Sequence, residues 1–199
     1  MISRYLTPKL ESRLGSGKAI IIVGPRQVGK TTLIKNLLEN KAHLFLDGDD
    51  PTVRILLTNT NTEQLKNIIG KHKLVFIDEA QRIENIGITL KIMTDQFKEV
   101  QLIVSGSSAF ELNNQLNEPL TGRKWEYQLY PLSTMEMVHH SSLLEEGRLL
   151  QQRLIYGFYP DIINHPSRAA DSLQELADNY LYKDLLSLES IRKPVLLER

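Results

Sequence analysis

A glycine-bounded loop at residues 24–32 constrains the fold of this chain more than any other feature. It follows the apolar run 19–23 and precedes a helical pattern at 33–38. A strand, a loop of the form Gly-x-x-x-x-Gly-Lys-Thr and a helix together are typical of a Walker A phosphate loop. Glycines let successive N–H groups turn toward an anion, and the following helix directs its free N–H groups to the same place. The predicted nucleotide-binding residues are Gly24, Pro25, Arg26, Gln27, Val28, Gly29, Lys30, Thr31 and Thr32.

Two side chains of this loop carry specific predictions. Lys30 is expected to reach the β- and γ-phosphate oxygens, and the Thr31 hydroxyl is expected to help hold Mg²⁺. The alternative is a strand-to-helix turn that binds nothing. The sequence favours the phosphate loop because both glycines, the lysine and the threonine are present in the right context.

A second motif follows the apolar run 74–77, which ends in Asp78 and Glu79. A carboxylate at the carboxyl end of a buried parallel strand lies where sheet proteins bind ligands, and this pattern is typical of Walker B. We expect Asp78 to bind Mg²⁺ together with Thr31, and Glu79 to orient and deprotonate the attacking water. Two solvated carboxylates at a strand end are the alternative, which the upstream Walker A loop makes less favourable.

Other nucleotide-binding classes fit less well. A GTPase would need Asp-x-x-Gly after this strand, whereas residues 78–81 read Asp-Glu-Ala-Gln, and the chain contains no Asn-Lys-x-Asp. A small-molecule kinase is possible, but the Asp-Glu pair favours activation of water over that of a substrate hydroxyl. The acidic stretch 47–50 could suggest a metal site. Asp50 before Pro51 is better explained as a helix N-cap.

The composition of the chain excludes several kinds of binding site and segment. The 199 residues carry 24 basic and 24 acidic side chains, so no global field favours nucleic acid or an anionic membrane. The chain has no cysteine, which excludes disulfides and thiolate metal sites. The apolar runs are far too short for a membrane span, and the first residues lack the apolar core of a secretory signal. We therefore expect a cytoplasmic protein.

Alternation of strands and helices predicts an α/β fold with an open parallel sheet. The predicted strands are 19–23, 43–46, 74–77, 101–104 and 125–129, and the predicted helices before residue 132 are 5–15, 33–38, 51–58, 62–69 and 86–98. Gly70 is expected to end the fourth helix, and Ile88, Ile92 and Phe97 are expected to face inward from the fifth. The chain is therefore divided into a core, 1–132, and a helical lid, 133–199. In the lid, Ser167 is expected to cap a helix at 168–189 that presents Leu173, Leu176, Tyr180 and Leu181.

The motifs taken together resemble one family, the prokaryotic AAA+-type ATPases that carry a nuclease-like domain of unknown function at their C-terminus. The resemblance rests on the two Walker motifs and on the segments 78–81, 105–108, 120–123 and 130–133, and it covers nearly the whole chain. It implies a P-loop three-layer sandwich of the AAA+ kind with strand order 5-1-4-3-2. It also implies that the chain ends before the nuclease-like domain.

The resemblance further implies roles for residues outside the Walker motifs. Ser107 or Ser105 occupies the place of a polar sensor of the γ-phosphate, although both could instead cap the helix that begins near residue 108. Arg123 matches a family-typical arginine that acts on transition-state charge, in cis or in trans; a plain surface arginine is the alternative. Pro160 ends a segment that in related ATPases lies near the adenine, although Phe158 replaces its second glycine.

The predicted activity is Mg²⁺-dependent binding and hydrolysis of ATP. One alternative is a nucleotide-gated interaction switch that binds ATP and ADP with negligible hydrolysis. Another is an ATPase module that serves a nucleic-acid-acting protein, which the neutral charge does not support. The expected partners are a second copy of the chain, another protein, or the missing C-terminal domain.

Overall fold

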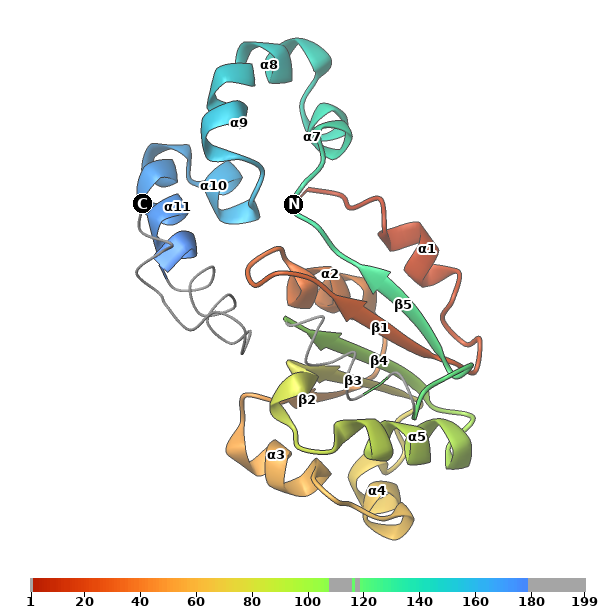
Figure 1. Cartoon of the computed structure of the whole chain (residues 1–199). Coiled ribbons are helices and arrows are strands. Elements are labelled where there is room, and N and C mark those ends of the chain that lie inside the picture. The colour runs from red at the N-terminus through yellow and green to blue at the C-terminus, as the bar shows by residue number, and fades with distance from the viewer. Residues whose placement is uncertain (1, 108–115, 117–118, 179–199) are drawn as a thin grey trace. The chain divides into compact units, whose positions relative to one another are not determined.

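A five-stranded parallel sheet lies at the centre of the computed structural model, which describes residues 2–107, 116 and 119–178 (Figure 1). The strands are β1 (Ala19–Val23), β2 (Leu44–Asp47), β3 (Leu74–Asp78), β4 (Gln101–Gly106) and β5 (Lys124–Gln128). They lie in the order β2-β3-β4-β1-β5, and every neighbouring pair is parallel. The predicted order is confirmed. Every residue of β1, β3 and β4 is buried, as their largely apolar sequences require of strands covered on both faces.

Helices cover both faces of this sheet (Figure 1). One face carries α3 (Pro51–Leu57), α4 (Thr62–Ile69) and α5 (Ile86–Gln96). The other carries α2 (Lys30–Leu38), and α1 (Thr7–Glu11) precedes β1 on the same side. A short 3-10 helix, η1 (Ala80–Arg82), directly follows β3. The three-layer arrangement expected from the sequence is thereby confirmed.

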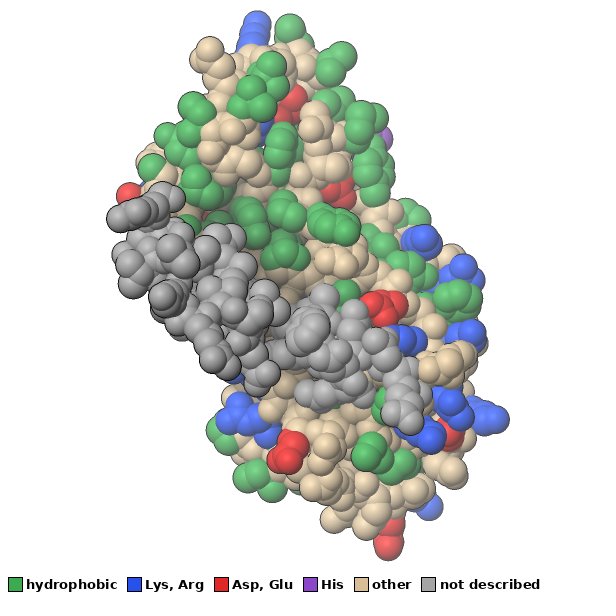
Figure 2. Space-filling view, viewed as in Figure 1, with side chains coloured by type: hydrophobic (Ala, Val, Ile, Leu, Met, Phe, Trp, Pro, Cys, Tyr) green, Lys and Arg blue, Asp and Glu red, His purple; other side chains and the backbone are tan. Residues whose placement is uncertain are grey.

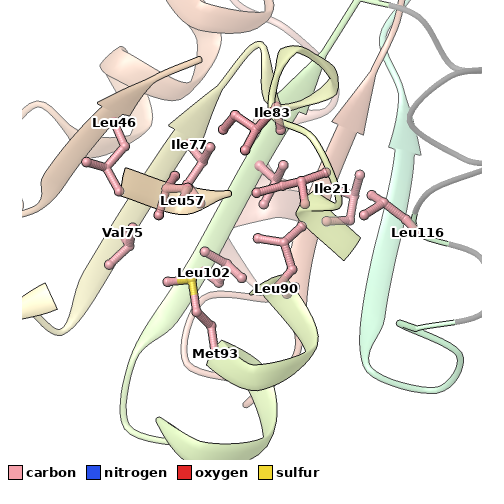
Figure 3. Packing of buried hydrophobic residues seen from close by; sticks show 14 of the residues in the cluster. Ile21, Leu46, Leu57, Val75, Ile77, Ile83, Leu90, Met93, Leu102 and Leu116 are labelled. Carbon is pink, nitrogen blue, oxygen red and sulfur yellow. The ribbon is translucent and has the colours of Figure 1, made fainter. Parts of the chain in front are cut away.

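The main core lies between the sheet and the layer formed by α3, α4 and α5. Figure 3 shows strand side chains such as Ile21, Val75 and Leu102 against Leu90 and Met93 of α5. All five are almost or fully buried. The alternate strand residues are buried toward the opposite face, because side chains of a strand point to its two faces in turn. This packing fixes the carboxyl ends of β1, β3 and β4 next to one another.

The start of α3 and the end of α4 follow local sequence signals. Asp50 caps α3 by accepting a hydrogen bond from the Thr52 N–H at 2.7 Å, and Gly70 ends α4 with φ of 57°; both predictions are confirmed.

The buried face of α5 differs from the prediction at one residue. Ile88, predicted to face inward, is 58% exposed. The buried stripe of α5 starts two residues earlier, and Ile88 lies on the far side of the helix from it. That stripe consists of Ile86, Gly87, Thr89, Leu90 and Met93, while Ile92 and Phe97 pack partly buried against the core.

The chain divides into two compact units, one of Ser3–Tyr130 and one that begins at Pro131. The second unit contains α7 (Thr134–His140), α8 (Leu143–Arg148), α9 (Leu150–Tyr156), α10 (Pro160–Asn164), the 3-10 helix η2 (Pro166–Arg168) and α11 (Ala169–Leu176). The predicted cap by Ser167 is wrong, because Ser167 lies inside η2 and Arg168 precedes α11. The rest of the helix predicted at 168–189, with Tyr180 and Leu181, lies outside the described residues.

The second unit has a small core and much exposed apolar surface. Ile162, Ala169 and Leu176 form its buried cluster. Figure 2 shows hydrophobic side chains gathered on the surface of this unit, and the exposed ones include Met135, Leu143, Leu144, Leu150, Leu154 and Ile155. Within the described part of the chain, no helix combines the length and apolar character that crossing a membrane requires.

Candidate functional site

The phosphate loop joins the end of β1 to the start of α2. Gly29 precedes α2 in a left-handed conformation with φ of 93°, and Gln27 also has positive φ, 62°. Gly24 is required for a different reason: a Cβ there would lie 2.1 Å from the Leu129 carbonyl oxygen. The first glycine thus lets Leu129, the residue after β5, approach the loop, and the second lets the chain turn into the helix. Val28, between them, is fully buried and anchors the loop in the core.

Lys30 is the first residue of α2, and its side chain folds back over the loop. Its Nζ donates hydrogen bonds to the carbonyl oxygens of Gly24 and Pro25, both at 2.9 Å. Only 4% of Lys30 is exposed. Neutral carbonyl oxygens compensate a buried ammonium less well than an anion does. A phosphate group in the loop would therefore find a lysine already in place.

Thr31 and Asp78 join the two predicted motifs. The Thr31 Oγ1 donates a hydrogen bond to Asp78 Oδ2 at 2.7 Å, although the residues are 47 positions apart. The other oxygen, Oδ1, accepts hydrogen bonds from the hydroxyl of buried Ser105 and from the Glu79 N–H. A hydroxyl and a carboxylate in contact are oxygen ligands of the kind that Mg²⁺ prefers. The pair therefore fits the predicted magnesium site.

Glu79 lies at a sharp turn between β3 and η1. Its φ of 47° and ψ of 43° place it in the left-handed region, which a residue other than glycine seldom adopts. The turn directs the chain into η1, so that the side chain of Gln81 returns to Glu79. Gln81 Nε2 donates a hydrogen bond to Glu79 Oε2 at 2.5 Å. The predicted base is thus held by a neighbour from its own turn.

Gln81 also contacts the predicted sensor. Its Nε2 donates to Ser107 Oγ at 2.9 Å, which links the ends of β3 and β4. Ser107 is 8% exposed, and Ser105 binds Asp78, so the two serines predicted as alternatives contact different parts of the site. The helix that they were expected to cap lies outside the described residues. The sequence assigned no role to Gln81, although its place two residues after Glu79 was an available signal.

Two further residues that the sequence did not reveal support the site. The Gly48 N–H donates to the Asp78 carbonyl oxygen at 2.8 Å, and a Cβ on Gly48 would lie 2.4 Å from the Glu79 carbonyl oxygen. Arg4 Nη1 donates to the Val28 carbonyl oxygen of the phosphate loop at 3.0 Å. Both contacts join segments that are 24 or more positions apart, so no local pattern announces them.

The two remaining predicted residues lie elsewhere. The Arg123 carbonyl oxygen accepts from the N–H of Ala19, at the start of β1, and the phosphate loop lies at the other end of this five-residue strand. That is about 16 Å at 3.3 Å per residue, beyond the reach of an arginine side chain. Arg123 therefore lies far from the phosphate loop of its own chain, and its action on transition-state charge stays a prediction. Its Nε donates to Asp95 Oδ1 at 2.6 Å, which lowers the pKa of that carboxyl. Pro160 begins α10 in the second unit, and its contact with adenine stays a prediction.

Comparison with protein families matches residues 16–138, more than half of the chain, to a family described as AAA domain. The chain belongs to this family. The matched range contains both predicted Walker motifs and the serines at the end of β4, and membership of the AAA family supports nucleotide binding.

This AAA protein is also similar to individual proteins. An uncharacterized protein of Mycobacterium tuberculosis is 28% identical over 121 residues, which are 60% of this chain and 26% of that protein. An energy-coupling factor transporter ATP-binding protein of Thermotoga maritima is 31% identical over 119 residues, 57% of this chain and 45% of its own length. The chain thus spans about a quarter of the length of its mycobacterial relatives. The nuclease-like domain implied by the resemblance stays a prediction.

The Walker-type ATPase of Pyrococcus abyssi has a similar structure. Its TM-score is 0.63 at 16% sequence identity, and the alignment covers 95% of this chain and 76% of that one. At this identity the likeness concerns the fold alone.

Proposed function

We propose that this AAA domain binds ATP with Mg²⁺ and hydrolyses the β–γ phosphoanhydride bond. The observation that carries the proposal is the 2.7 Å hydrogen bond between Thr31 of the phosphate loop and Asp78 of β3. It brings the predicted phosphate-binding loop into contact with the predicted magnesium-binding carboxylate. Bound Mg²⁺ would neutralise charge on the β- and γ-phosphates during transfer.

Residues of the chain itself bind the phosphates and activate the attacking water. Lys30 and the backbone N–H groups of the phosphate loop bind the phosphates, and the buried setting of Lys30 strengthens that attraction. Glu79 directly follows Asp78, and its carboxylate orients and deprotonates the attacking water. Ser107 directly follows the neighbouring strand. Its hydroxyl, which accepts a hydrogen bond from Gln81, contacts the γ-phosphate or this water.

Steady-state ATP turnover with and without Mg²⁺ tests the proposal. Glu79→Gln should retain ATP binding and lose turnover by about 10²–10⁴-fold, the usual contribution of a general base. Lys30→Ala should lose tight ATP binding, because the phosphates then lack their buried cation. Turnover by Glu79→Gln equal to that of the wild type would refute the assigned role of Glu79.

The same assay separates the alternatives. ATP binding without turnover in the wild type would favour the nucleotide-gated switch. Turnover that rises with protein concentration would support an oligomer in which Arg123 of one subunit acts on the nucleotide of the next. Steeply salt-dependent affinity for DNA would support a nucleic-acid role.

A further inference from the structure

The carboxamide of Gln81 occupies the space between the predicted base and the predicted sensor. Its Nε2 carries two hydrogens, and both are used: one bonds Glu79 Oε2 at 2.5 Å and the other Ser107 Oγ at 2.9 Å. The contact with the carboxylate identifies this atom as the nitrogen, because the carboxamide oxygen has no hydrogen to donate to Glu79.

The other end of the same carboxamide is unusual. Gln81 Oε1 is buried and has no hydrogen-bond partner in the part of the chain that the structure describes. An unpaired buried acceptor is unfavourable, whereas a hydrogen bond to a charged carboxylate is stronger than one between neutral groups. The Gln81 side chain therefore keeps the orientation in which Nε2 binds the Glu79 carboxylate, although Oε1 then has no partner among the described residues.

The backbone around Gln81 is well anchored. Ala80 and Ile83, which flank it within and just after η1, are fully buried. The left-handed turn at Glu79 starts this 3-10 helix immediately after β3. Gln81 thus projects from a rigid turn rather than from a loose loop, and its position depends little on exposed side chains.

We propose that Gln81 is a positioning residue for hydrolysis, an inference that rests on the proposed ATPase function. It holds the Glu79 carboxylate in one orientation toward the attacking water and couples that orientation to Ser107. Gln81 itself transfers no proton.

Gln81→Met tests this role because methionine has nearly the same length and lacks both the donors and the unpaired acceptor. We expect kcat to fall about 10–100-fold, since a misplacement of about 1 Å has effects of this size. Nucleotide affinity and the thermal unfolding midpoint should stay close to those of the wild type. Gln81→Asn, one methylene shorter, should show the same loss of kcat, and it replaces Gln81→Met if that variant does not fold.

Arg82→Ala is the matched control. Arg82 belongs to the same 3-10 helix, but its side chain is 46% exposed and lies 3.4 Å from Asp49. Its removal should leave kcat unchanged. A role confined to folding would instead lower the unfolding midpoint and nucleotide affinity of Gln81→Met together with kcat, and that result would overturn the proposal.

A double variant gives the decisive comparison. In a Glu79→Gln background, Gln81→Met should cause no further loss of turnover, because the group that it positions is already inactive. An undiminished further loss would overturn the proposal. If the wild type hydrolyses ATP and Gln81→Met has the same kcat, this inference alone is refuted. Absence of turnover in the wild type with Mg²⁺ would refute the proposed function and this inference with it.

Discussion

Replacement of Gly48 by alanine should disable hydrolysis without touching any side chain of the site. A Cβ at this position would lie 2.4 Å from the Glu79 carbonyl oxygen and 2.8 Å from that of Asp78, whereas ordinary contacts begin at 3.4 Å. These atoms belong to the backbone of β3 and of the turn that follows it, so no flexible side chain can move aside. Glu79 must then shift by about 1 Å, a displacement that lowers kcat about 100-fold.

The same clash should lower the free energy of unfolding by about 1–3 kcal/mol, as overpacking usually does. ATP affinity should persist, because the backbone atoms nearest the added Cβ belong to Asp78 and Glu79 rather than to the phosphate loop. Phosphate-release kinetics, a nucleotide-binding titration and urea denaturation measure the three quantities. Gly48 is not among the residues with positive φ, so backbone strain does not complicate the substitution.

Gly147→Ala is the control for this experiment. Gly147 lies in α8, and a Cβ there meets no atom within 4 Å. Alanine should therefore leave turnover unchanged and stabilise the helix by about 0.5–1 kcal/mol. If Gly48→Ala retained wild-type kcat, the inferred dependence of Glu79 on this close backbone contact would be incorrect.

Two further predictions concern stability. Arg153 donates to both oxygens of Glu146 at 2.9 Å and lowers the pKa of this carboxyl from 4.5, and the Glu146 side chain is only 4% exposed. The contribution of this pair should be complete above about pH 4.5, the unfolded-state value, and should be lost as pH falls through the lower folded-state pKa. Urea denaturation across this range should show a smaller difference between wild type and Glu146→Gln at low pH; a constant difference would contradict the assignment. Asp50→Ala removes the N-cap of α3 and should cost about 1 kcal/mol. Asp49→Ala, which removes only an exposed pairing at 3.4 Å, should cost less in the same denaturation assay, and equal losses would exclude the capping explanation.

Local patterns were sufficient for the elements and for the central motif. Continuous apolar runs predicted β1, β3 and β4, because strands covered on both faces must be apolar throughout. The glycine spacing predicted the phosphate loop, and Asp50 before Pro51 predicted the start of α3. Each of these signals acts within a few residues along the chain. Ile88 of α5 was predicted to face inward but is exposed. A helical pattern identifies the buried face of a helix only when the first residue of the helix is known.

The sequence by itself predicted that Lys30, Thr31, Asp78 and Glu79 lie close together, since both predicted Walker motifs follow buried strands whose carboxyl ends meet at one edge of the sheet. Only the tertiary structure decided which residues support that site. The order and register of the strands bring Gly48 against Glu79 and place Arg123 at the opposite edge. Such contacts depend on crossovers between distant segments, and these are fixed by the packing of the whole domain rather than by any local pattern.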